Sequence, residues 1–481
     1  MTRVCIPLSP ATTEECCEKM RQLAPCCDLF EIRADAFVED ADLARIFRTA
    51  SRPLIWTHRN EAEGGKNNPR QGRRMAEYQS ALEHGAAWVD VEWRSGLGRQ
   101  LDAGERTVLS FHDFEKTPPD VLPMIREMAE MPGAVIKVAT RVVQTRDLLV
   151  LAQGARWASE RRRKHVIFGM GIDGKPLRVL APQLGAEWTY AALDRPTAEG
   201  QLSGDDLRLF RFGQLGRTSR IFAVIGNPVA HSRSPSFHNA AYGRLGQDAV
   251  YISIRVDDLS SYLNLASELG ISGWSVTLPW KAEMARACDP QDEASRQSGV
   301  VNTVRREGNR LLGWNTDWYG FLQPLRSRLS LKGMRATILG AGGVARTAVA
   351  ALTGEGAQVT VMARRREALE EFRRAFSVTA RLLDEAPPAS GDLIVNTTPV
   401  GMSPAENEIA VPASLLQNFR VAYDLVYTPR ETLFLREAAQ QGLQTISGWE
   451  MFIHQAAEQV RIFTGQNLPQ DWLNAQLGTE G

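Results

Sequence analysis

The stretch Ala134-Val-Ile-Lys137-Val-Ala-Thr140 places a single lysine inside an otherwise apolar and largely β-branched run. Such a run is typical of a strand that is buried on both faces, as in a parallel sheet. An unpaired ammonium is costly there, and burial lowers the pKa of a lysine so that its free amine can attack a carbonyl carbon. A structural ion pair with Glu31 is the alternative, and this stretch alone does not decide between the two roles.

Seven other short runs of strand-like composition occur in the first 200 residues, and segments of helical composition separate most of them. The eight runs cover residues 4–9, 29–35, 54–59, 88–93, 107–114, 134–140, 165–171 and 187–193. Strands that alternate with helices predict a parallel sheet, and eight such repeats predict a closed (β/α)8 TIM barrel. A last helix over 205–212 would complete this barrel domain, which is expected to span residues 1–213.

The rest of the chain is predicted to form two further α/β domains after a polar, glycine-containing linker at 213–219. The first is expected over 220–330, with the C-terminal helix at 449–475 packing back on it, and the second over 331–448. In the second, a strand precedes Gly340-Ala341-Gly342-Gly343-Val344-Ala345. Glycines between a strand and a helix are typical of a Rossmann-like turn, which admits a pyrophosphate to the helix N-terminus.

The predicted strand at 358–363 ends in Arg364-Arg365-Arg366, where an enzyme that uses NAD would carry an acidic residue. Arginines at this point suit the 2′-phosphate of NADP. A solvated basic start of a helix is the plainer alternative. The sequence therefore predicts NADP(H) as the cofactor.

Composition gives no reason to expect a macromolecular or membrane partner. The 481 residues include 56 basic and 56 acidic side chains, so no net charge favours nucleic acid or an anionic membrane. No apolar run reaches about 18 residues, and the N-terminus lacks the apolar region of a signal peptide, so a cytoplasmic location is expected. The six cysteines match no zinc spacing, and no metal site is predicted.

Polar side chains gather at the carboxyl ends of the predicted barrel strands, where barrel active sites are built. The segments that carry them are Glu31-Ile-Arg33-Ala-Asp35, Arg59-Asn-Glu-Ala-Glu63-Gly-Gly65, Ser110-Phe-His112-Asp113 and the Lys137 strand. A hydrogen-bonded core histidine is the plainer interpretation of His112 alone. An amine and an imidazole on adjacent strands, however, form a pair suited to imine formation and proton transfer.

In this order, these segments resemble type I 3-dehydroquinate dehydratase over residues 1 to about 212. The resemblance implies that Lys137 forms a Schiff base with the C3 ketone of 3-dehydroquinate. His112 would remove the C2 proton and assist loss of the C1 hydroxyl as water, with Glu63 positioning it. The substrate would be bound by Glu31, Arg33, Arg59, Arg178, Thr197 and Gln201. Thr197 stands where serine is common in the family's lid, and Glu199 replaces a proline.

A second set of motifs resembles shikimate dehydrogenase over about 220–475. The motifs begin at Gly226, Ser275, Gly299, Gly313, Asn396, Asp424 and Gly448. The resemblance implies a catalytic pair, Lys281 and Asp317, for NADPH-linked reduction of 3-dehydroshikimate. It implies substrate binding by Ser232, Ser234, Thr277, Asn302, Tyr427 and Gln455, and cofactor binding by Gly340, Ala341, Gly342, Gly343, Val344, Ala345, Arg364, Arg365, Thr397, Met402 and Gly448.

Three residues depart from the second family's usual pattern. Ser275 replaces an asparagine, Trp318 replaces a glycine, and Ala363 replaces an asparagine. The two resemblances support each other, because the product of the first reaction is the substrate of the second. An NAD-linked quinate/shikimate dehydrogenase half and a non-catalytic metabolite-sensing regulator are the alternatives. The arginines at 364–366 argue against the first, and the presence of Lys137, His112, Lys281 and Asp317 argues against the second.

Overall fold

The computed structural model describes residues 2–66, 71–101, 103–193, 199–385 and 390–478. Two compact units make up the chain. Unit 1 comprises Met1–Tyr242 and Asp248–Ile271, and unit 2 comprises Gly243–Gln247 and Ser272–Gly481. We describe each unit by itself.

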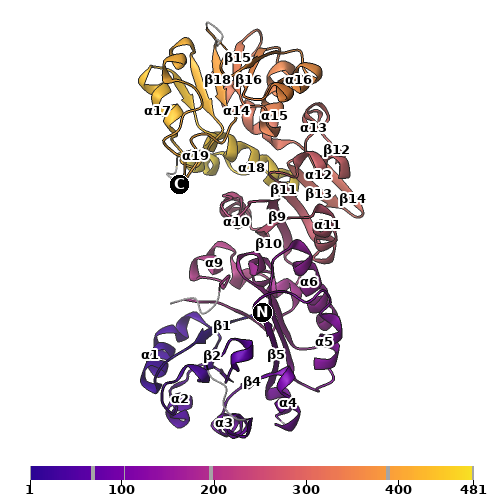
Figure 1. The fold of residues 1–481 in the computed structure, drawn as a ribbon, viewed down its shortest axis with the longest axis vertical. Coiled ribbons are helices and arrows are strands. Elements are labelled where there is room, and N and C mark those ends of the chain that lie inside the picture. Colours follow the sequence, from indigo (N-terminus) through magenta and orange to yellow (C-terminus); the bar gives the residue numbers. More distant parts are fainter. Residues whose placement is uncertain (1, 67–70, 102, 194–198, 386–389, 479–481) are drawn as a thin grey trace. The chain divides into compact units, whose positions relative to one another are not determined.

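The first part of unit 1 is an eight-stranded parallel sheet that is nearly closed into a barrel (Figure 1). Its strands are β1 (Arg3–Leu8), β2 (Leu29–Arg33), β3 (Leu54–Thr57), β4 (Trp88–Glu92), β5 (Thr107–Asp113), β6 (Val135–Arg141), β7 (His165–Met170) and β8 (Trp188–Tyr190). The strand order is β7-β6-β5-β4-β3-β2-β1-β8. The two end strands, β7 and β8, approach each other where the Glu187 backbone amide donates to the His165 carbonyl at 2.9 Å. The predicted barrel is therefore confirmed, and each strand begins within one residue of its predicted start.

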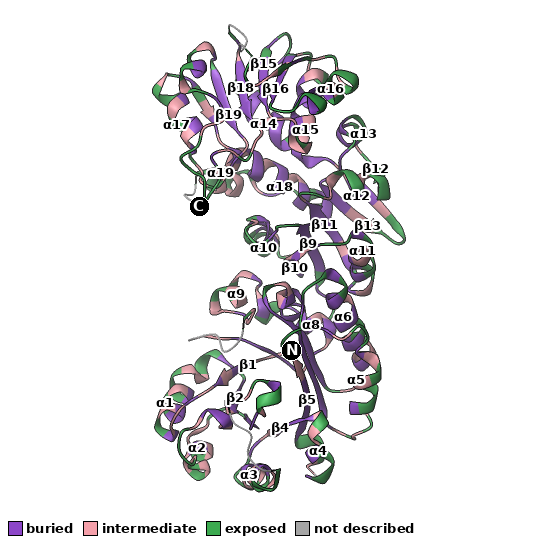
Figure 2. Cartoon of the chain, viewed as in Figure 1, coloured by how far each residue is buried: buried purple, intermediate pink, exposed green. Residues whose placement is uncertain are grey.

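Helices connect these strands on the outside of the barrel. They are α1 (Thr13–Leu23), α2 (Leu43–Thr49), α3 (Gln71–Glu83), α4 (Leu97–Gln100), α5 (Leu122–Met128), α6 (Thr145–Glu160), α7 (Lys175–Val179), α8 (Ala181–Leu184) and α9 (Gly204–Leu209). Polar side chains satisfy the free amides where several of them begin; Thr12 caps α1, and Gln144 with Asp147 forms a capping box at α6. Because the helices cover the sheet, the strands are buried almost throughout (Figure 2).

Unit 1 continues beyond the barrel with β9 (Arg220–Gly226), α10 (Ser234–Arg244), β10 (Ala249–Arg255) and α11 (Leu259–Glu268). The two strands pair in parallel, from Arg220 against Ala249 to Gly226 against Arg255. Helix α11 packs along α6 of the barrel. The barrel and this segment therefore form one compact unit.

Unit 2 contains two sheets. The first runs in the order β11 (Ile271–Val276), β13 (Thr303–Glu307), β14 (Arg310–Trp314), β12 (Asp289–Pro290). The second is parallel, in the order β17 (Thr379–Leu382), β16 (Gln358–Ala363), β15 (Arg335–Leu339), β18 (Leu393–Asn396), β19 (Val421–Asp424), β20 (Gln444–Ile446). A parallel sheet of this order, with helices on its faces, confirms the predicted Rossmann-like fold.

The helices of unit 2 are α12 (Lys281–Ala287), α13 (Glu293–Ser298), α14 (Thr316–Arg326), α15 (Gly343–Gly354), α16 (Arg366–Ala375), α17 (Leu433–Gln440), α18 (Gly448–Thr464) and α19 (Gln470–Gly478). Helices α14 and α18 pack most closely at Gly320, where an added Cβ would lie 2.7 Å from the Cβ of Gln455. One apolar core lies between the second sheet and α14, α15 and α16, and another lies on the α17 side. Among the described residues, we find no helix with the length and apolarity needed to cross a membrane.

Candidate active sites

A lysine and two carboxylates meet inside the barrel. The Nζ of Lys137 lies 2.8 Å from Oδ2 of Asp90 and 3.1 Å from Oε2 of Glu31. The three residues come from β6, β4 and β2, and alternate strands contribute side chains to the same layer of a barrel interior. All three are at most 4% exposed, so the amine is held in one place by charge and by packing.

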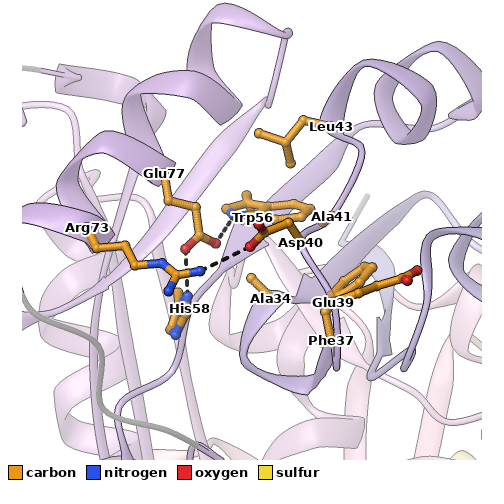
Figure 3. Close-up of a pocket in the computed structure, with 10 residues that line it drawn as sticks. All are labelled: Ala34, Phe37, Glu39, Asp40, Ala41, Leu43, Trp56, His58, Arg73 and Glu77. Carbon is orange, nitrogen blue, oxygen red and sulfur yellow. Dashed lines mark hydrogen bonds and ion pairs between the residues drawn. The ribbon is translucent and has the colours of Figure 1, made fainter.

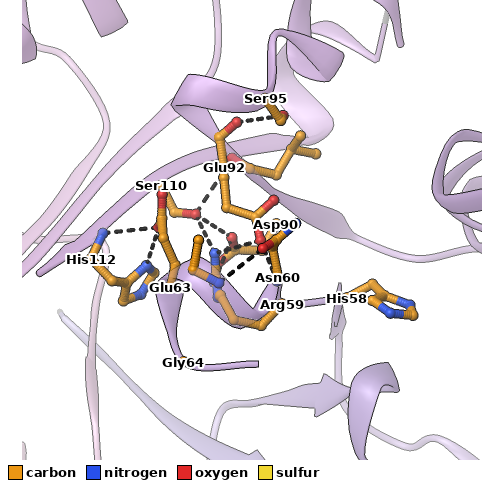
Figure 4. A network of polar contacts seen from close by, with 12 residues as sticks. His58, Arg59, Asn60, Glu63, Gly64, Asp90, Glu92, Ser95, Ser110 and His112 are labelled. Carbon is orange, nitrogen blue, oxygen red and sulfur yellow. Dashed lines mark hydrogen bonds and ion pairs between the residues drawn. The ribbon is translucent and has the colours of Figure 1, made fainter. Parts of the chain in front are cut away.

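Arg59 joins Asp90 of this centre to Ser110 on β5 (Figure 4). Its guanidinium donates to Asp90 at 2.8 Å and to the Ser110 hydroxyl at 2.7 Å, and that hydroxyl donates to Asp90 at 2.6 Å. Burial alone would raise the pKa of Asp90, but the charges of Arg59 and Lys137 outweigh burial and hold that pKa well below its usual range. Asp90 is therefore a fixed anion between two cations.

His112 and Glu63 form a second contact at the same end of the barrel. One carboxylate oxygen of Glu63 lies 3.0 Å from both Nδ1 and the backbone amide of His112. Burial raises the pKa of Glu63 to about 7. Burial, followed by the charges of Arg59 and Lys137, lowers the pKa of His112 well below its usual value. His112 is therefore neutral at pH 7, as a general base must be.

The turn after Glu63 requires glycine. Gly64 has φ +83°, and an added Cβ would lie 2.7 Å from the ring of Phe114, which stacks on His112 at an interplanar angle of 14°. At Gly65 an added Cβ would lie 1.9 Å from the Arg59 carbonyl oxygen. The glycines thus let the Glu63 loop close over the strand ends.

Arg178 is a buried cation held without a carboxylate among the described residues. Its Nε donates to the Gly169 carbonyl at 3.0 Å, and its guanidinium lies over the Phe168 ring at 4.0 Å. Nη1 has no hydrogen-bond partner in the described structure, and burial lowers the pKa of the group to about 9. The Phe168 ring contacts that of Tyr190, which lies beneath the Lys137 amine. A buried guanidinium with a free donor suits a carboxylate ligand.

The remaining predicted substrate-binding residues of the barrel have different surroundings. Arg33 binds both oxygens of Asp35 at 2.9 Å and donates to the Gly64 carbonyl at 3.2 Å. Gln201 precedes Leu202, which bridges to Ala191 at the end of β8. Thr197 lies outside the described residues.

Asp90 and Tyr190 were not among the predicted site residues, although both contact the Lys137 amine. Asp90 carried a signal, because an acidic residue inside the apolar run Trp88-Val-Asp-Val-Glu92 is as unusual as a lysine inside its own run. Its place on an even-numbered strand was a second signal, since Glu31 and Lys137 also lie on even-numbered strands. No pattern in the sequence marked Tyr190.

A separate pocket of about 570 Å³ lies on the outer side of β3 (Figure 3). His58 and Trp56 line it, and both bind the Glu77 carboxylate at 2.8 Å. Successive side chains of a strand point to opposite faces, which explains why Arg59 faces the barrel interior and His58 does not. This pocket shares no lining residue with the Lys137 centre.

In unit 2, a lysine–aspartate pair is the counterpart of the barrel centre. The Nζ of Lys281, the first residue of α12, lies 2.6 Å from Oδ2 of Asp317, in the first turn of α14. The Asn302 amide donates to the other oxygen of Asp317 at 2.8 Å. Oδ1 of the Asn302 side chain accepts from the Thr316 backbone amide at 2.7 Å, so Asp317 and its helix start are fixed together.

The other predicted substrate-binding residues lie in both units. In unit 2, the Tyr427 and Phe452 rings form a tilted pair with centroids 5.4 Å apart, and the side-chain amide of Gln455 donates to the Phe452 carbonyl at 3.1 Å. Thr277 lies after β11, four residues before Lys281. In unit 1, the backbone amide of Ser234 donates to the Ser232 hydroxyl at 3.3 Å at the start of α10.

Each of the three departures has a clear environment. Ser275 is buried, and its hydroxyl donates to Oε1 of Gln459 at 2.8 Å. Trp318 packs against the core between α14 and α15, with its ring 3.4 Å from where a Cβ of Gly354 would lie. Ala363 is buried at the end of β16.

The glycine-rich turn after β15 has room for a ligand above the start of α15. Gly340 has φ +115°, and an added Cβ would lie 2.5 Å from the Thr397 hydroxyl, which itself donates to the Leu339 carbonyl. At Gly342 and Gly343, by contrast, an added Cβ would meet nothing within 4 Å. The open space at the helix N-terminus fits a pyrophosphate.

Cationic side chains follow at the end of β16. Arg364 and Arg365 are exposed. Arg364 lines a pocket of about 880 Å³ together with residues 382–385, at the end of β17, and residues between 410 and 418. Met402 is 47% exposed. Gly448 begins α18 close to the carbonyl oxygen of Val426, which would lie only 2.5 Å from an added Cβ. A larger residue would not fit at this position.

A barrel with a buried lysine–carboxylate centre, followed by a lysine–aspartate pair and a dinucleotide-type sheet, defines a chain of two enzymes, a lysine-centred lyase and a nucleotide-linked dehydrogenase. Residues 4–212 match the family model of type I 3-dehydroquinase, residues 224–304 that of the shikimate dehydrogenase substrate binding domain, and residues 448–471 that of the shikimate 5'-dehydrogenase C-terminal domain. The chain belongs to the family of bifunctional 3-dehydroquinate dehydratase/shikimate dehydrogenases.

The bifunctional chloroplastic enzyme of Arabidopsis thaliana is 30% identical over 92% of this chain and 79% of its own. The shikimate dehydrogenase (NADP(+)) of a Nostoc species is 36% identical over 54% of this chain and 96% of its own. A crystal structure of a shikimate dehydrogenase in complex with NADP+ covers 55% of this chain and 96% of its own, with 31% identity and a TM-score of 0.52. The predicted resemblance to both enzymes is confirmed, and the predicted cofactor is the one named for these relatives.

Proposed function

We propose that this chain dehydrates 3-dehydroquinate to 3-dehydroshikimate in the barrel and reduces that product to shikimate with NADPH in the dehydrogenase half. Membership of the bifunctional family supports both activities. The observation that carries the proposal is the barrel centre, where a buried amine lies among fixed charges and near a neutral imidazole. A regulator that only binds metabolites would not need this arrangement.

In the barrel, the Lys137 amine attacks the C3 ketone, and water leaves as the iminium forms. His112 takes the C2 proton through Nε2, and the electron pair of the C–H bond moves toward the iminium nitrogen. The C1 hydroxyl then leaves as water with the proton from His112, and hydrolysis of the imine frees the amine. Ionised Glu63 accepts from Nδ1–H of His112, which keeps Nε2 free to accept the proton.

The surrounding charges bind and orient the substrate. Arg178 offers its free Nη1 to the substrate carboxylate, and Arg33, Glu31 and Gln201 face the hydroxyls. Arg59 and Asp90 keep the Lys137 amine at one point of the barrel. Holding reactants in a fixed geometry is what makes such a condensation fast.

In the dehydrogenase half, Lys281 gives a proton to the oxygen of the reduced ketone, and Asp317 orients Lys281 and contacts a substrate hydroxyl. Asn302, Thr277, Tyr427 and Gln455 bind the substrate in unit 2, and the substrate-binding roles of Ser232 and Ser234 stay predictions. The turn at 340–345, Thr397, Met402 and Gly448 would hold NADPH, and Arg364 and Arg365 would supply positive charge for its 2′-phosphate. When bound, NADPH supplies the hydride to the ketone carbon.

The test is a single assay on the purified chain with 3-dehydroquinate and NADPH. We expect NADPH oxidation after a lag in which 3-dehydroshikimate accumulates, and much slower oxidation with NADH. Lys281→Met should stop at 3-dehydroshikimate, and Lys137→Ala should oxidise NADPH only when given 3-dehydroshikimate. A wild-type chain that performs neither step would contradict the proposal.

A further inference from the structure

The segment that follows the barrel in unit 1 contacts the barrel near its active end. Helix α11 packs along α6 (Figure 1). Strand β10 contacts α7. Helix α6 is buried around most of its circumference, because α5 and α11 cover it in addition to the barrel. Residues 224–304 match the dehydrogenase substrate-binding domain, so β10 and α11 belong to the second enzyme.

Asp257, in the turn between β10 and α11, holds the start of α6. Its carboxylate accepts from the backbone amide of Thr145 at 2.8 Å and from the Thr145 hydroxyl. In return, the Asp257 amide donates to that hydroxyl at 3.1 Å. A carboxylate at a helix N-terminus is favourable, and the contacts to Thr145 lower the pKa of Asp257 although its partial burial opposes them.

Arg255, the last residue of β10, binds two loops of the barrel at once. Its Nε lies 2.8 Å from Oδ2 of Asp173, which follows β7. Its Nη2 donates to the carbonyl of Val143, which follows β6. We call Arg255 and Asp257 the clasp.

The two loops in the clasp lead to proposed catalytic and substrate-binding residues. Strand β6 carries Lys137, and the turn with Asp173 leads into α7, which carries Arg178. That turn has little freedom, since a Cβ on Gly174 would lie 2.3 Å from the Gly169 carbonyl carbon. The same Gly169 carbonyl accepts from Nε of Arg178. A movement of the Asp173 turn would therefore shift this carbonyl and, with it, the Arg178 guanidinium.

The end of the family's lid rests on the same turn. The Gly171 amide donates to the Glu199 carbonyl at 3.2 Å, and the two backbones are so close that a Cβ on Gly200 would lie 2.1 Å from the Gly171 oxygen. The clasp therefore fixes the surface on which this part of the lid lies.

We infer that Arg255 and Asp257 of the dehydrogenase half are positioning residues for the dehydratase. The clasp holds the β6 and β7 loops, and through them Arg178, in the geometry that receives the substrate carboxylate. This inference rests on the proposed dehydratase activity. Because Lys137 sits within a rigid strand and Arg178 depends on the turn, loss of the clasp raises KM for 3-dehydroquinate more than it lowers kcat.

The experiment compares Arg255→Ala and Asp173→Ala with the double variant in the full-length chain. Each single variant should raise the dehydratase KM by roughly 10-fold, in keeping with loss of a hydrogen-bonded charge pair. The double variant should be no worse than Arg255→Ala alone, because both substitutions remove the contact between Arg255 and Asp173. KM for NADPH, measured with 3-dehydroshikimate, should stay within about twofold of the wild-type value.

Arg156→Ala is the matched control. Arg156 on α6 pairs with Glu268 at the end of α11 at 3.1 Å, so it belongs to the same surface but lies away from the barrel mouth. We expect its dehydratase KM to equal that of the wild type. Equal effects of Arg156→Ala and Arg255→Ala, or a wild-type KM in Asp173→Ala, would overturn the inference. A wild-type chain without dehydratase activity would instead refute the proposed function itself.

Discussion

The two lysine–aspartate pairs of this chain have different surroundings. The Lys137 side chain is 4% exposed, lies within a strand, and has two carboxylates against it. The Lys281 side chain is 13% exposed, begins a helix, and has Asp317 as its carboxylate partner in the described structure. An amine enclosed by fixed charges is suited to bond formation with a substrate carbon, whereas an amine at a more open helix start can give up a proton and regain it from solvent.

Replacing each lysine by arginine tests this difference most strongly, because arginine keeps the charge. Lys137→Arg should lower dehydratase kcat/KM by at least roughly 10³-fold, since a guanidinium does not form the imine. NADPH oxidation with 3-dehydroshikimate, measured on the same sample, is the internal control and should be unchanged. Dehydratase activity above a tenth of the wild-type level would show that Lys137 acts through its charge alone.

Lys281→Arg should have a smaller effect on the other reaction. We expect kcat for reduction to fall about 10²-fold, because arginine is a poor proton donor near pH 7 but can still pair with Asp317. Steady-state kinetics with NADPH and 3-dehydroshikimate measure this change, and dehydratase activity serves as the control. A reduction rate equal to that of the wild type would remove Lys281 from proton transfer.

The fold was predictable because the strands of a barrel are apolar runs of regular spacing. The start of each predicted barrel strand is within one residue of the observed start, but the ends differ; the run predicted to reach 35 stops at Arg33, where the chain enters a 3₁₀ turn. Local hydrogen bonds decide such ends, and periodicity does not report them.

The sites were predictable only in part. Lys137, His112 and Glu63 were predicted because rare polar residues stood in apolar strands or in a family motif, and their catalytic roles stay predictions. Asp90 was not found, although an acidic residue inside an apolar run was a signal, because its role depends on the curved sheet, which brings side chains of the alternate strands β4 and β6 together. Contacts between distant segments, such as Arg255 with Asp173, leave no local pattern in the sequence at all.

Neutralising the aspartate of each pair compares their contributions to stability. Asp90→Asn leaves Lys137 and Arg59 buried with less negative charge, and we expect a loss of about 3–5 kcal/mol in the free energy of unfolding. Asp317→Asn should cost about 1 kcal/mol, because Lys281 is more open to solvent. Denaturant unfolding of the two variants checks this, and equal losses would contradict the contrast.

The smallest expected effect is a pH dependence of the dehydratase reaction. The pKa of Glu63 is raised to about 7, so its carboxylate ionises as pH increases through neutrality. The ionised form is the stronger acceptor for Nδ1–H of His112 and better stabilises the imidazolium that forms, so dehydratase kcat/KM should rise severalfold between pH 6 and pH 8. Glu63→Gln should flatten this rise, and a profile that keeps its inflection in the variant would assign it to another group.

Borohydride trapping tests the central claim most directly. The chain is incubated with 3-dehydroquinate, reduced with sodium borohydride, digested and analysed by mass spectrometry, with 3-dehydroshikimate as a second substrate. We predict a stable adduct on the peptide that contains Lys137 and an unmodified peptide that contains Lys281. An adduct on Lys281, or none on Lys137, would contradict the assignment of nucleophile to one lysine and proton donor to the other.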